Sequence, residues 1–436
     1  MTHDDTAPAD APTRGVSRRA LLGGAGAGIA ALGIGAAGGF AAGRSTAPEV
    51  QSAAAYPFQG THQSGVVTPQ QDHLHFAAFD VTTDSRDALI TLLRQWSAAA
   101  VSLTAGQDIG MGTDGGSYDA PPDDTGEAHG LSASGLTLTF GFGRSLFEAD
   151  GVDRFGLADR LPSALIEIPH FSGDDLEPGR VGGDLCVQAC ADDPQVATHA
   201  IRNLARIAFG TAALRWDQLG FGRTSSTTRA QTTPRNLMGF KDGTANLKAE
   251  DASLVDEHVW ASADDGAAWM ASGTYLVARR IRILTDTWDR TSLREQEQLV
   301  GRTKGTGAPL SGGDEFTEPD FEIAGRDGAP LIPVDSHVQM AHPAQSGVRM
   351  LRRGYNFTDG ADSLGRLNAG LFFLAFVRDP ATQFVPLQSK MSKSDLMTVE
   401  YLRSTGSALF AVPAAIPAGA TVTESTGRFI GDALFS

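Results

Sequence analysis

The chain has 436 residues, of which 41% are hydrophobic and 20% charged, a composition typical of soluble globular proteins rather than of disordered or membrane-embedded ones. Its length suffices for two domains of about 100–200 residues each. The formal net charge of −16 repels phosphate backbones and anionic lipid, so no nucleic-acid partner is expected. A small substrate is not excluded, because a local pocket can differ in charge from the whole protein.

The first 55 residues predict an export leader. Arg18 and Arg19, in the run "SRRALL", precede a long uncharged stretch of mainly Ala and Gly that continues to Arg44. So many glycines make a poor transmembrane helix, whereas paired arginines before a mildly apolar run resemble a twin-arginine signal. We expect cleavage after residues 53–55, with an uncleaved anchor as the alternative. The mature protein is then extracellular, in the cell envelope or periplasmic, without a stable membrane span.

The first half of the mature chain alternates strand-like and helix-like patterns. Residues 72–81 alternate enough for a strand, and residues 85–101 then carry apolar side chains at helical spacing. A stretch rich in Gly, Asp and Pro at 106–130 indicates a long surface loop. The expected strands are 72–81, 135–143, 183–190 and 212–222, and the expected helices are 85–101 and 193–210.

The second half repeats the order β-α-β-β-α-β. Its expected strands are 273–284, 349–357, 370–379 and 406–413, and its expected helices are 291–302 and 384–404. Two such units predict an α+β fold of two ferredoxin-like halves. Each antiparallel sheet would be covered by helices on one face, so the bare faces are expected to pack together, as in a dimeric α+β barrel. We expect domains at 56–235 and 236–436.

The two cysteines, Cys186 and Cys190, lie in "GDLCVQAC". On a strand they are about 13 Å apart at about 3.3 Å per residue, which is beyond the reach of a disulfide. Their even spacing places both on one face of the strand. Two buried, small apolar side chains are therefore expected, rather than a metal or redox site.

The segment "NLMGFKDGTANL", at 236–247, carries an acid among apolar and small residues. It joins the two halves, and ligand sites are common at such joins. Arg352 and Arg353 are adjacent on an expected strand and therefore point to opposite faces; if one is solvated, the other points inward. A buried arginine needs a polar or anionic partner, for which Asp242 is the candidate, with a structural salt bridge as the alternative. Lys241 is expected to face solvent.

Common metal and nucleotide motifs are absent from the sequence. It has no His-x-x-x-His or Cys-x-x-Cys pair, no Gly-x-x-x-x-Gly-Lys loop and no Gly-x-Ser-x-Gly elbow. An acid, one or two arginines and a single axial histidine remain, and these suit peroxide activation at a haem. The iron takes one His ligand, an acid–base group moves a proton between the peroxide oxygens, and a cation stabilises the departing oxygen.

Several segments resemble one known family. They are "YPFQGTHQSGVVTPQQ", "TPRNLMGFKDGTANL", "GTYLVARRIRI", "DSHVQMAHP", "RMLRRGYNF", "GLFFLAF" and "GSALFAVP". Together with the leader, they make nearly all of the mature chain similar to the dye-decolorizing-type (DyP) haem peroxidases, in the exported, EfeB-like deferrochelatase/peroxidase class. The Gly-x-x-Asp-Gly motif at 239–243, followed by the later His and the Arg-Arg-Gly-Tyr segment, makes the resemblance specific.

The resemblance implies a role for each matching position. Asp242 matches the distal acid, Arg352 the distal arginine, and His337 the proximal ligand of the iron in haem b (iron protoporphyrin IX). The half at 236–436 would then be the haem-binding domain. The further positions expected to contact the cofactor are Gly243, Thr244, Ala245, His342, Leu371 and Phe373.

Two positions depart from the family pattern. Gln339 stands where an arginine is expected, and Ala344 replaces what is often an arginine near a haem propionate. Fewer positive charges beside the propionates predict a modest change in redox potential or haem retention.

The resemblance implies an exported peroxidase that reduces hydrogen peroxide and oxidises small organic reductants such as dyes or phenols. The alternative is a deferrochelatase that releases iron from haem, acting beside iron-uptake components. A non-enzymatic haem carrier is disfavoured by the placed acid and arginine. Assembly into a homo-oligomer is compatible with each of these functions.

Overall fold

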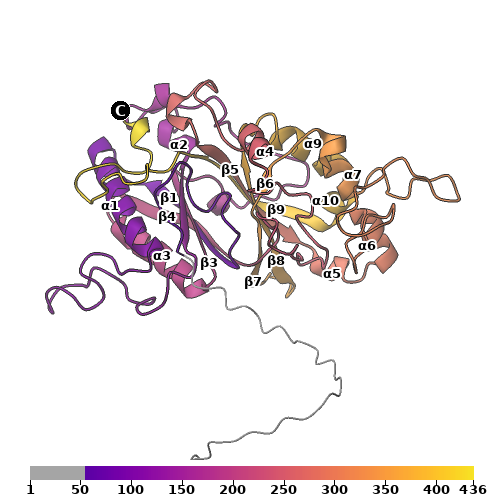
Figure 1. Cartoon of the computed structure of the whole chain (residues 1–436), viewed down its shortest axis with the longest axis horizontal. Helices are drawn as coiled ribbons and strands as arrows, with labels where there is room; N and C mark the ends of the chain where they lie inside the picture. The colour runs from indigo at the N-terminus through magenta and orange to yellow at the C-terminus, as the bar shows by residue number, and fades with distance from the viewer. Residues whose placement is uncertain (1–54) are drawn as a thin grey trace, which may run out of the picture. The chain divides into compact units, whose positions relative to one another are not determined.

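Antiparallel strands form a sheet that closes into a barrel (Figure 1). The computed structural model describes residues 55–436, so the expected leader lies outside the described residues. The strands are β1 (His73–Val81), β2 (Thr137–Gly143), β3 (Leu185–Ala191), β4 (Ala212–Arg223), β5 (Thr274–Ile283), β6 (Leu351–Arg352), β7 (Tyr355–Ala361), β8 (Leu367–Val377) and β9 (Leu402–Val412). The order around the ring is β5-β9-β2-β3-β1-β4-β7-β8, and β8 pairs back onto β5.

The closed ring confirms the expected antiparallel barrel and corrects how its halves meet. Strand β2 pairs with β9 (Phe142↔Ala411), and β4 pairs with β7 (Phe221↔Asn356). The two halves therefore join edge to edge in one continuous sheet, instead of stacking two separate sheets through their bare faces. Closure leaves no unpaired edge within the ring, which removes the main liability of an open sheet.

Two long helices cover the N-terminal strands. Helix α1 (Arg86–Thr104) begins after Ser85, whose side chain accepts a hydrogen bond from the backbone N–H of Ala88. Helix α3 (Pro194–Ile207) begins with a proline after the capping Asp193. The capping side chains stabilise the first turn of each helix because they accept hydrogen bonds from backbone N–H groups that have no partner within the helix. Proline suits the first helical position because it has no backbone N–H to satisfy. The short α2 (Arg144–Phe147) follows β2.

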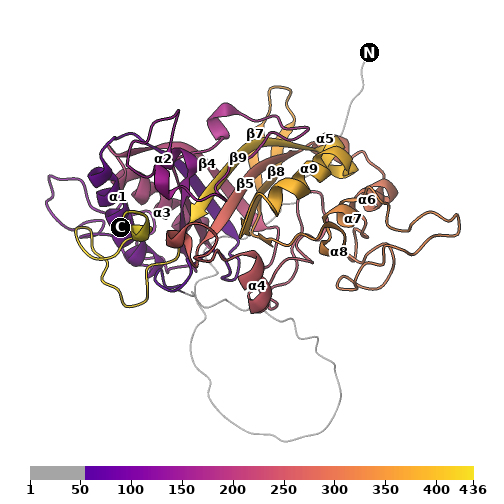
Figure 2. The same ribbon diagram turned by 90° about the horizontal axis from the view of Figure 1, so that it is seen from above.

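The remaining helices belong to the C-terminal half. Figures 1 and 2 show α5, α6, α7 and α9 together on one side of the barrel, away from α1 and α3. The helices are α4 (Ala252–His258), α5 (Thr285–Trp288), α6 (Leu293–Val300), α7 (His337–Ala341), α8 (Pro343–Ser346), α9 (Phe384–Ser394) and α10 (Leu396–Tyr401). Short 3-10 turns occur at Ala158–Arg160, Pro178–Arg180, Ala268–Met270 and Asp432–Leu434.

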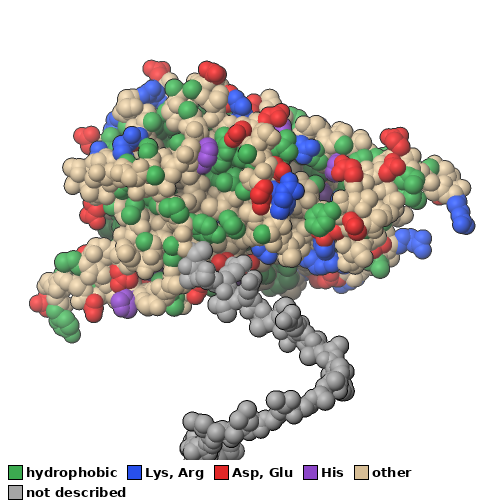
Figure 3. All heavy atoms as spheres, viewed as in Figure 1, with side chains coloured by type: hydrophobic (Ala, Val, Ile, Leu, Met, Phe, Trp, Pro, Cys, Tyr) green, Lys and Arg blue, Asp and Glu red, His purple; other side chains and the backbone are tan. Residues whose placement is uncertain are grey.

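Charged side chains of both signs are interspersed with apolar ones on the face seen in Figure 3. The acidic excess of the whole sequence thus does not gather into one large acidic patch on this face.

Within residues 55–436, no helix has the length and apolar character needed to cross a membrane.

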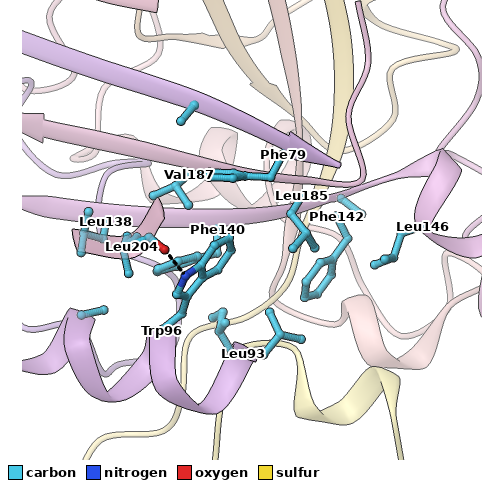
Figure 4. Packing of buried hydrophobic residues seen from close by; sticks show 14 of the residues in the cluster. Phe79, Leu93, Trp96, Leu138, Phe140, Phe142, Leu146, Leu185, Val187 and Leu204 are labelled. Carbon is cyan, nitrogen blue, oxygen red and sulfur yellow. Dashed lines mark hydrogen bonds between the residues drawn. The ribbon is translucent and has the colours of Figure 1, made fainter. Parts of the chain in front are cut away.

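Trp96 on α1 anchors the larger hydrophobic core. Its ring packs against Phe79 and Phe140, with ring centroids 5.2 and 5.8 Å away. Its Nε1 donates a 2.8 Å hydrogen bond to the carbonyl oxygen of Leu204 on α3 (Figure 4). Truncating a buried ring of this kind costs about 3–5 kcal/mol. This contact therefore fixes both helices to the N-terminal strands.

A second core fills the interior of the barrel. Cys186 and Cys190 of β3 lie in it together with Phe76, Trp216 and Tyr355. Both cysteines are buried and free, as their spacing predicts. Burial raises the pKa of both thiols, which agrees with a packing role rather than a reactive one.

Two of the expected elements are interrupted. The strand expected at 349–357 is broken into β6 and β7 by Arg353 and Gly354. The helix expected at 384–404 ends at Ser394 and restarts after Asp395, whose side chain caps α10. Both interruptions occur beside the site described next.

Candidate active site

A deep cavity lies between the outer face of the C-terminal strands and the helices that cover them. About 1870 Å³ of space is left free between these elements, with the open solvent at the mouth of the cavity included. Arg279, Ile281 and Ile283 of β5 face it, while Leu276 and Ala278 face the barrel interior. Other lining residues are Asn236, Met238, Phe240, Lys241, Asp242, Val300, Arg302, His337, Arg349, Arg352, Met391 and Met397.

A tight hairpin holds Asp242 at the cavity wall. The backbone N–H of Asp242 donates to the carbonyl of Pro234, and that of Asn236 donates to the carbonyl of Phe240. Gly239 forms the turn with a φ of +84°, which glycine adopts without strain. The segment between the two halves is thus an ordered hairpin that presents its acid to the cavity.

Asp242 and Arg352 form an ion pair, as the sequence predicts. Nη1 of Arg352 donates to Oδ1 of Asp242 at 2.8 Å, and the side chains are 29% and 14% exposed respectively. The backbone of Arg352 is clamped as well. Asn246 accepts from its N–H and donates to its carbonyl, both at 2.8 Å, and Ser225 donates to the same carbonyl. The segment that carries the acid therefore also fixes the arginine.

Five of the six further positions expected to contact a cofactor form the walls of the cavity around this pair. Gly243, Thr244 and Ala245 follow the acid along the wall, and Leu371 and Phe373 of β8 supply an apolar surface. Gly243 has a φ of +88°, and a Cβ built there would lie 2.8 Å from Cα of Ser225. Glycine is therefore required at this position by its backbone conformation and by close packing.

His337 stands at the start of α7 and also lines the cavity. Its Nδ1 lies 2.7 Å from Oδ2 of Asp395, a carboxylate that is 0% exposed. The hydroxyl of Thr398 donates to the same oxygen. Burial alone would lower the pKa of His337, but Asp395 outweighs this effect and raises the pKa above its ordinary value. With Nδ1 bonded to Asp395, Nε2 is the ring nitrogen available to a metal.

His342, the sixth position, lines the same cavity at the end of α7. Its Nε2 lies 3.5 Å from Oε1 of Glu318, and its ring packs against Phe321. Burial lowers the pKa of His342. Its partner therefore differs from that of His337, which is Asp395. Within residues 55–436, no three His, Cys, Asp or Glu side chains gather as a metal site.

The expectation for Lys241 is wrong. Lys241 does not simply face solvent: it lines the cavity and forms an ion pair with Glu315, which is 10% exposed in its side chain. Of the two adjacent arginines, Arg352 faces the cavity and stays partly exposed. Arg353 is 0% exposed and donates to the backbone carbonyl of Thr68 and to the side chain of Gln71.

The cavity is rich in positive charge, in contrast to the acidic chain. Five cationic side chains line it against two carboxylates: Lys241, Arg279, Arg302, Arg349 and Arg352 against Asp174 and Asp242. Neither Gln339 nor Ala344 is among the lining residues. Arginines from other elements thus supply the positive charge that these two positions lack.

Three side chains that hold the site have no clear signal in the sequence. Asp395 lies 58 residues from His337, and its only sequence signal is a residue type that favours helix N-caps. Asn246 and Asn236 lie in the quoted hairpin segment, and Nδ2 of Asn236 donates to Oδ2 of Asp242 at 3.1 Å. An asparagine in a turn is too common to indicate such a contact from sequence.

Two family models match the chain. The model described as "Dyp-type peroxidase, N-terminal" matches residues 63–222, and the one described as "Dyp-type peroxidase, C-terminal" matches residues 233–416. Residues 223–232, which lie between the two matched ranges, directly precede the hairpin that carries Asp242.

Characterised relatives cover most or all of the chain. A dye-decolorizing peroxidase of Thermobifida fusca (strain YX) is 36% identical over 464 aligned positions, which cover 100% of this chain and 99% of that protein. A deferrochelatase of Escherichia coli (strain K12) is 34% identical over 361 positions, covering 81% of this chain and 82% of that protein.

Solved structures show the same fold. An oxyferrous complex of DtpA from Streptomyces lividans matches with a TM-score of 0.77 and 39% identity, over 88% of this chain and 98% of that chain. A DyP-type peroxidase from Cellulomonas bogoriensis matches with a TM-score of 0.76 and 36% identity, over 88% and 99%.

Proposed function

The chain belongs to the family of Dyp-type peroxidases and is a haem-dependent oxidoreductase, and we propose that Asp242, Arg352 and His337 carry its reaction with hydrogen peroxide. The observation that supports these roles is that all three side chains open into one cavity. There, Asp242 is hydrogen-bonded to Arg352, and Nδ1 of His337 is hydrogen-bonded to the fully buried carboxylate of Asp395.

The residues of the cavity fit a haem. His337 offers one free ring nitrogen, which is what an axial ligand requires. Leu371 and Phe373 offer an apolar wall, and the surplus of cationic side chains suits a flat cofactor that carries two carboxylates. Haem bound there supplies the Lewis-acid and redox chemistry that splits peroxide.

Each residue then has a distinct task. His337 would hold the haem iron through its remaining ring nitrogen, and Asp395 fixes the orientation of the ring through Nδ1. Asp242 accepts a proton from the nearer peroxide oxygen and returns it to the departing one. Arg352 orients the Asp242 carboxylate through their hydrogen bond and would stabilise the negative charge that develops on the departing oxygen. Small organic reductants return the two electrons.

Replacing Asp242 by asparagine tests these roles. Asp242→Asn keeps the shape of the side chain but removes its ability to accept a proton. The Soret band should persist, and the reaction with peroxide should slow about 10²–10⁴-fold. Stopped-flow absorbance measures this step, and Asp217→Asn, a carboxylate outside the cavity that contacts His75, is the matched control. An unchanged rate across the pH range would refute the proton-transfer role.

Release of iron from haem is a second proposed function. It is favoured by the 34% identity to a protein named deferrochelatase, over 81% of this chain. Anaerobic incubation of the protein with haem, followed by fluorescence detection of free protoporphyrin, separates the two activities. Porphyrin formed without peroxide, at a rate unchanged in Asp242→Asn, would favour iron release.

We further propose that the barrel consists of two ferredoxin-like halves, at 56–235 and 236–436. The support is the strand order, because β4-β1-β3-β2 in the first half corresponds to β9-β5-β8-β7 in the second. A helix follows the first and third strands of each half.

Export through the twin-arginine route, with removal of residues 1–55, is also a proposal. It is supported by Arg18 and Arg19 ahead of the uncharged stretch. Replacing both by lysine should leave the protein inside the cell, and sequencing the N-terminus of exported protein would locate the cleavage site. Light scattering on that mature protein would measure whether it forms the expected homo-oligomer.

A further inference from the structure

Both oxygens of the Asp242 carboxylate have a hydrogen-bond donor. Arg352 donates to Oδ1 at 2.8 Å, and Asn236 donates to Oδ2 at 3.1 Å. Asn236 itself lines the cavity. An amide donor carries no net charge, so this contact orients the carboxylate without adding a second ion pair.

The orientation of the Asn236 amide is fixed by the turn in which it lies. Its Oδ1 accepts a 3.0 Å hydrogen bond from the backbone N–H of Met238. The N–H of Gly239 donates to the backbone carbonyl of Asn236, and the N–H of Asn236 donates to the carbonyl of Phe240. Because the amide oxygen faces an N–H group, the amide nitrogen must face Asp242.

We propose that Asn236 is a positioning residue for the peroxide reaction: its amide holds the Asp242 carboxylate beside Arg352 and favours the ionised form that accepts the proton. This inference rests on the proposed role of Asp242. Hydrogen bonds to a carboxylate stabilise its charged form. The other charged groups near this carboxylate are Arg352 on β6, Lys241 with its partner Glu315, and His337 on α7.

Two substitutions separate positioning from a purely structural role in the turn. Asn236→Asp keeps an oxygen that can accept from the N–H of Met238, and aspartate favours such turns as strongly as asparagine does. It replaces the donor that faces Asp242 by an anion. Asn236→Ala removes both the turn contact and the donor. A structural role predicts that the alanine variant is the more impaired, and positioning predicts that the aspartate variant is.

The readout is the midpoint pH, at which the rate of the peroxide reaction has fallen to half of its value at higher pH. Without the amide donor, Asp242 keeps its proton at higher pH, so this midpoint should rise. We expect a rise of about one pH unit in Asn236→Ala, in line with the strength of hydrogen bonds to charged groups, and a larger rise in Asn236→Asp, which adds a negative charge beside Asp242. Stopped-flow absorbance at the Soret band measures the midpoint.

Cyanide gives a readout without turnover. Hydrogen cyanide must release its proton to a base in the cavity before the anion binds the iron, so the pH dependence of its association rate should shift in the same order. Asn236→Ser, which retains a hydroxyl donor, should restore the midpoint toward that of the unmodified protein. If Asn236→Asp does not fold or load haem, the order of the serine and alanine variants decides.

The controls distinguish failure of this inference from failure of the proposed function. Asn368→Asp places a carboxylate beside the Arg280–Asp359 pair, outside the cavity, and should leave the midpoint unchanged. If Asp242→Asn retains the midpoint of the unmodified protein, the proposed function fails. If Asp242→Asn abolishes the midpoint but Asn236→Asp leaves it unchanged, only the role of Asn236 is overturned. The same holds if the midpoint of Asn236→Ser equals that of Asn236→Ala.

Discussion

Two Asp–Arg pairs face the same cavity and differ in how far water reaches them. The side chains of Asp174 and Arg279 are 3% and 1% exposed, whereas those of Asp242 and Arg352 are 14% and 29% exposed. The first pair joins a loop of the N-terminal half to β5 of the C-terminal half. The second joins the hairpin between the halves to β6.

The difference in exposure separates a structural pair from a reactive one. In Arg279, Nε and Nη1 are buried without a hydrogen-bond partner among the described residues. The charge of this guanidinium is therefore compensated by Asp174. A pair that is shielded to this degree exchanges protons with water much less readily than a partly exposed one. The partly exposed pair keeps its carboxylate accessible from the cavity, which is what a proton carrier needs.

The largest effect is expected from breaking the sealed pair. Arg279→Met leaves Asp174 as an uncompensated buried charge, so the free energy of unfolding should fall by about 3–5 kcal/mol. Urea denaturation of the haem-free protein measures the loss. Arg279→Met protein that still folds should react with peroxide at nearly the rate of the unmodified protein. A large loss of this rate at unchanged stability would instead make the Asp174–Arg279 pair the reactive one.

The open pair should respond in the opposite way. Arg352→Met removes the cation beside the departing oxygen, so the peroxide reaction should slow about 10²–10³-fold. Stability should change by less than about 1 kcal/mol, because the pair is partly solvated. The two quantities are measured on one preparation, by stopped-flow absorbance and by denaturation. A stability loss as large as that of Arg279→Met would make both pairs structural.

Asp395, a fully buried carboxylate behind the cavity wall, is paired with a histidine rather than an arginine. Asp395→Asn weakens the hold on Nδ1 of His337, and loss of such a partner typically costs about 10–100-fold in metal affinity. We expect faster transfer of haem to an excess of an apo-globin acceptor, followed by absorbance. Thr398→Val, which removes only the hydroxyl that supports Asp395, should have a smaller effect in the same direction.

The smallest effect is expected from an Asp–Arg pair outside the cavity. Hydrogen bonds from Arg378 lower the pKa of Asp265 to about 2, from an ordinary value of 3.8. The pair therefore stabilises the fold fully above about pH 4, and this contribution is lost as the pH falls through 2. Its side chains are 28% and 34% exposed, so solvent screening limits it to less than about 1 kcal/mol. Comparing the stability of Asp265→Asn with the unmodified protein at pH 6 and pH 3 measures it.

The sequence predicts the parts of this protein that depend on local patterns. Strand alternation and helix periodicity identify nearly all the elements around the ring, and the spacing of Cys186 and Cys190 correctly predicts two free, buried thiols. The need of an inward arginine for a polar or anionic partner makes Asp242 a candidate, and the family resemblance selects Arg352 as its partner. These predictions need only neighbouring residues or simple charge compensation.

The missed features depend on contacts between distant residues. Asp395 interrupts an otherwise continuous helical pattern because its side chain caps α10 and holds His337. The sealed Asp174–Arg279 pair connects residues 105 positions apart. Closure of the ring through β2–β9 and β4–β7 is likewise set by tertiary pairing, which periodicity does not report.

The clamp on Arg352 makes the spacing of the two catalytic residues independent of most of the chain between them. Asn246, four residues after Asp242, fixes the backbone of Arg352 together with Ser225, so the 105 residues between Asn246 and Arg352 do not set the distance. The exposed turn around Gly328, where a Cβ would meet no atom within 4 Å, can therefore accept inserted residues or a peptide tag. We expect such insertions to leave the reaction with peroxide unchanged.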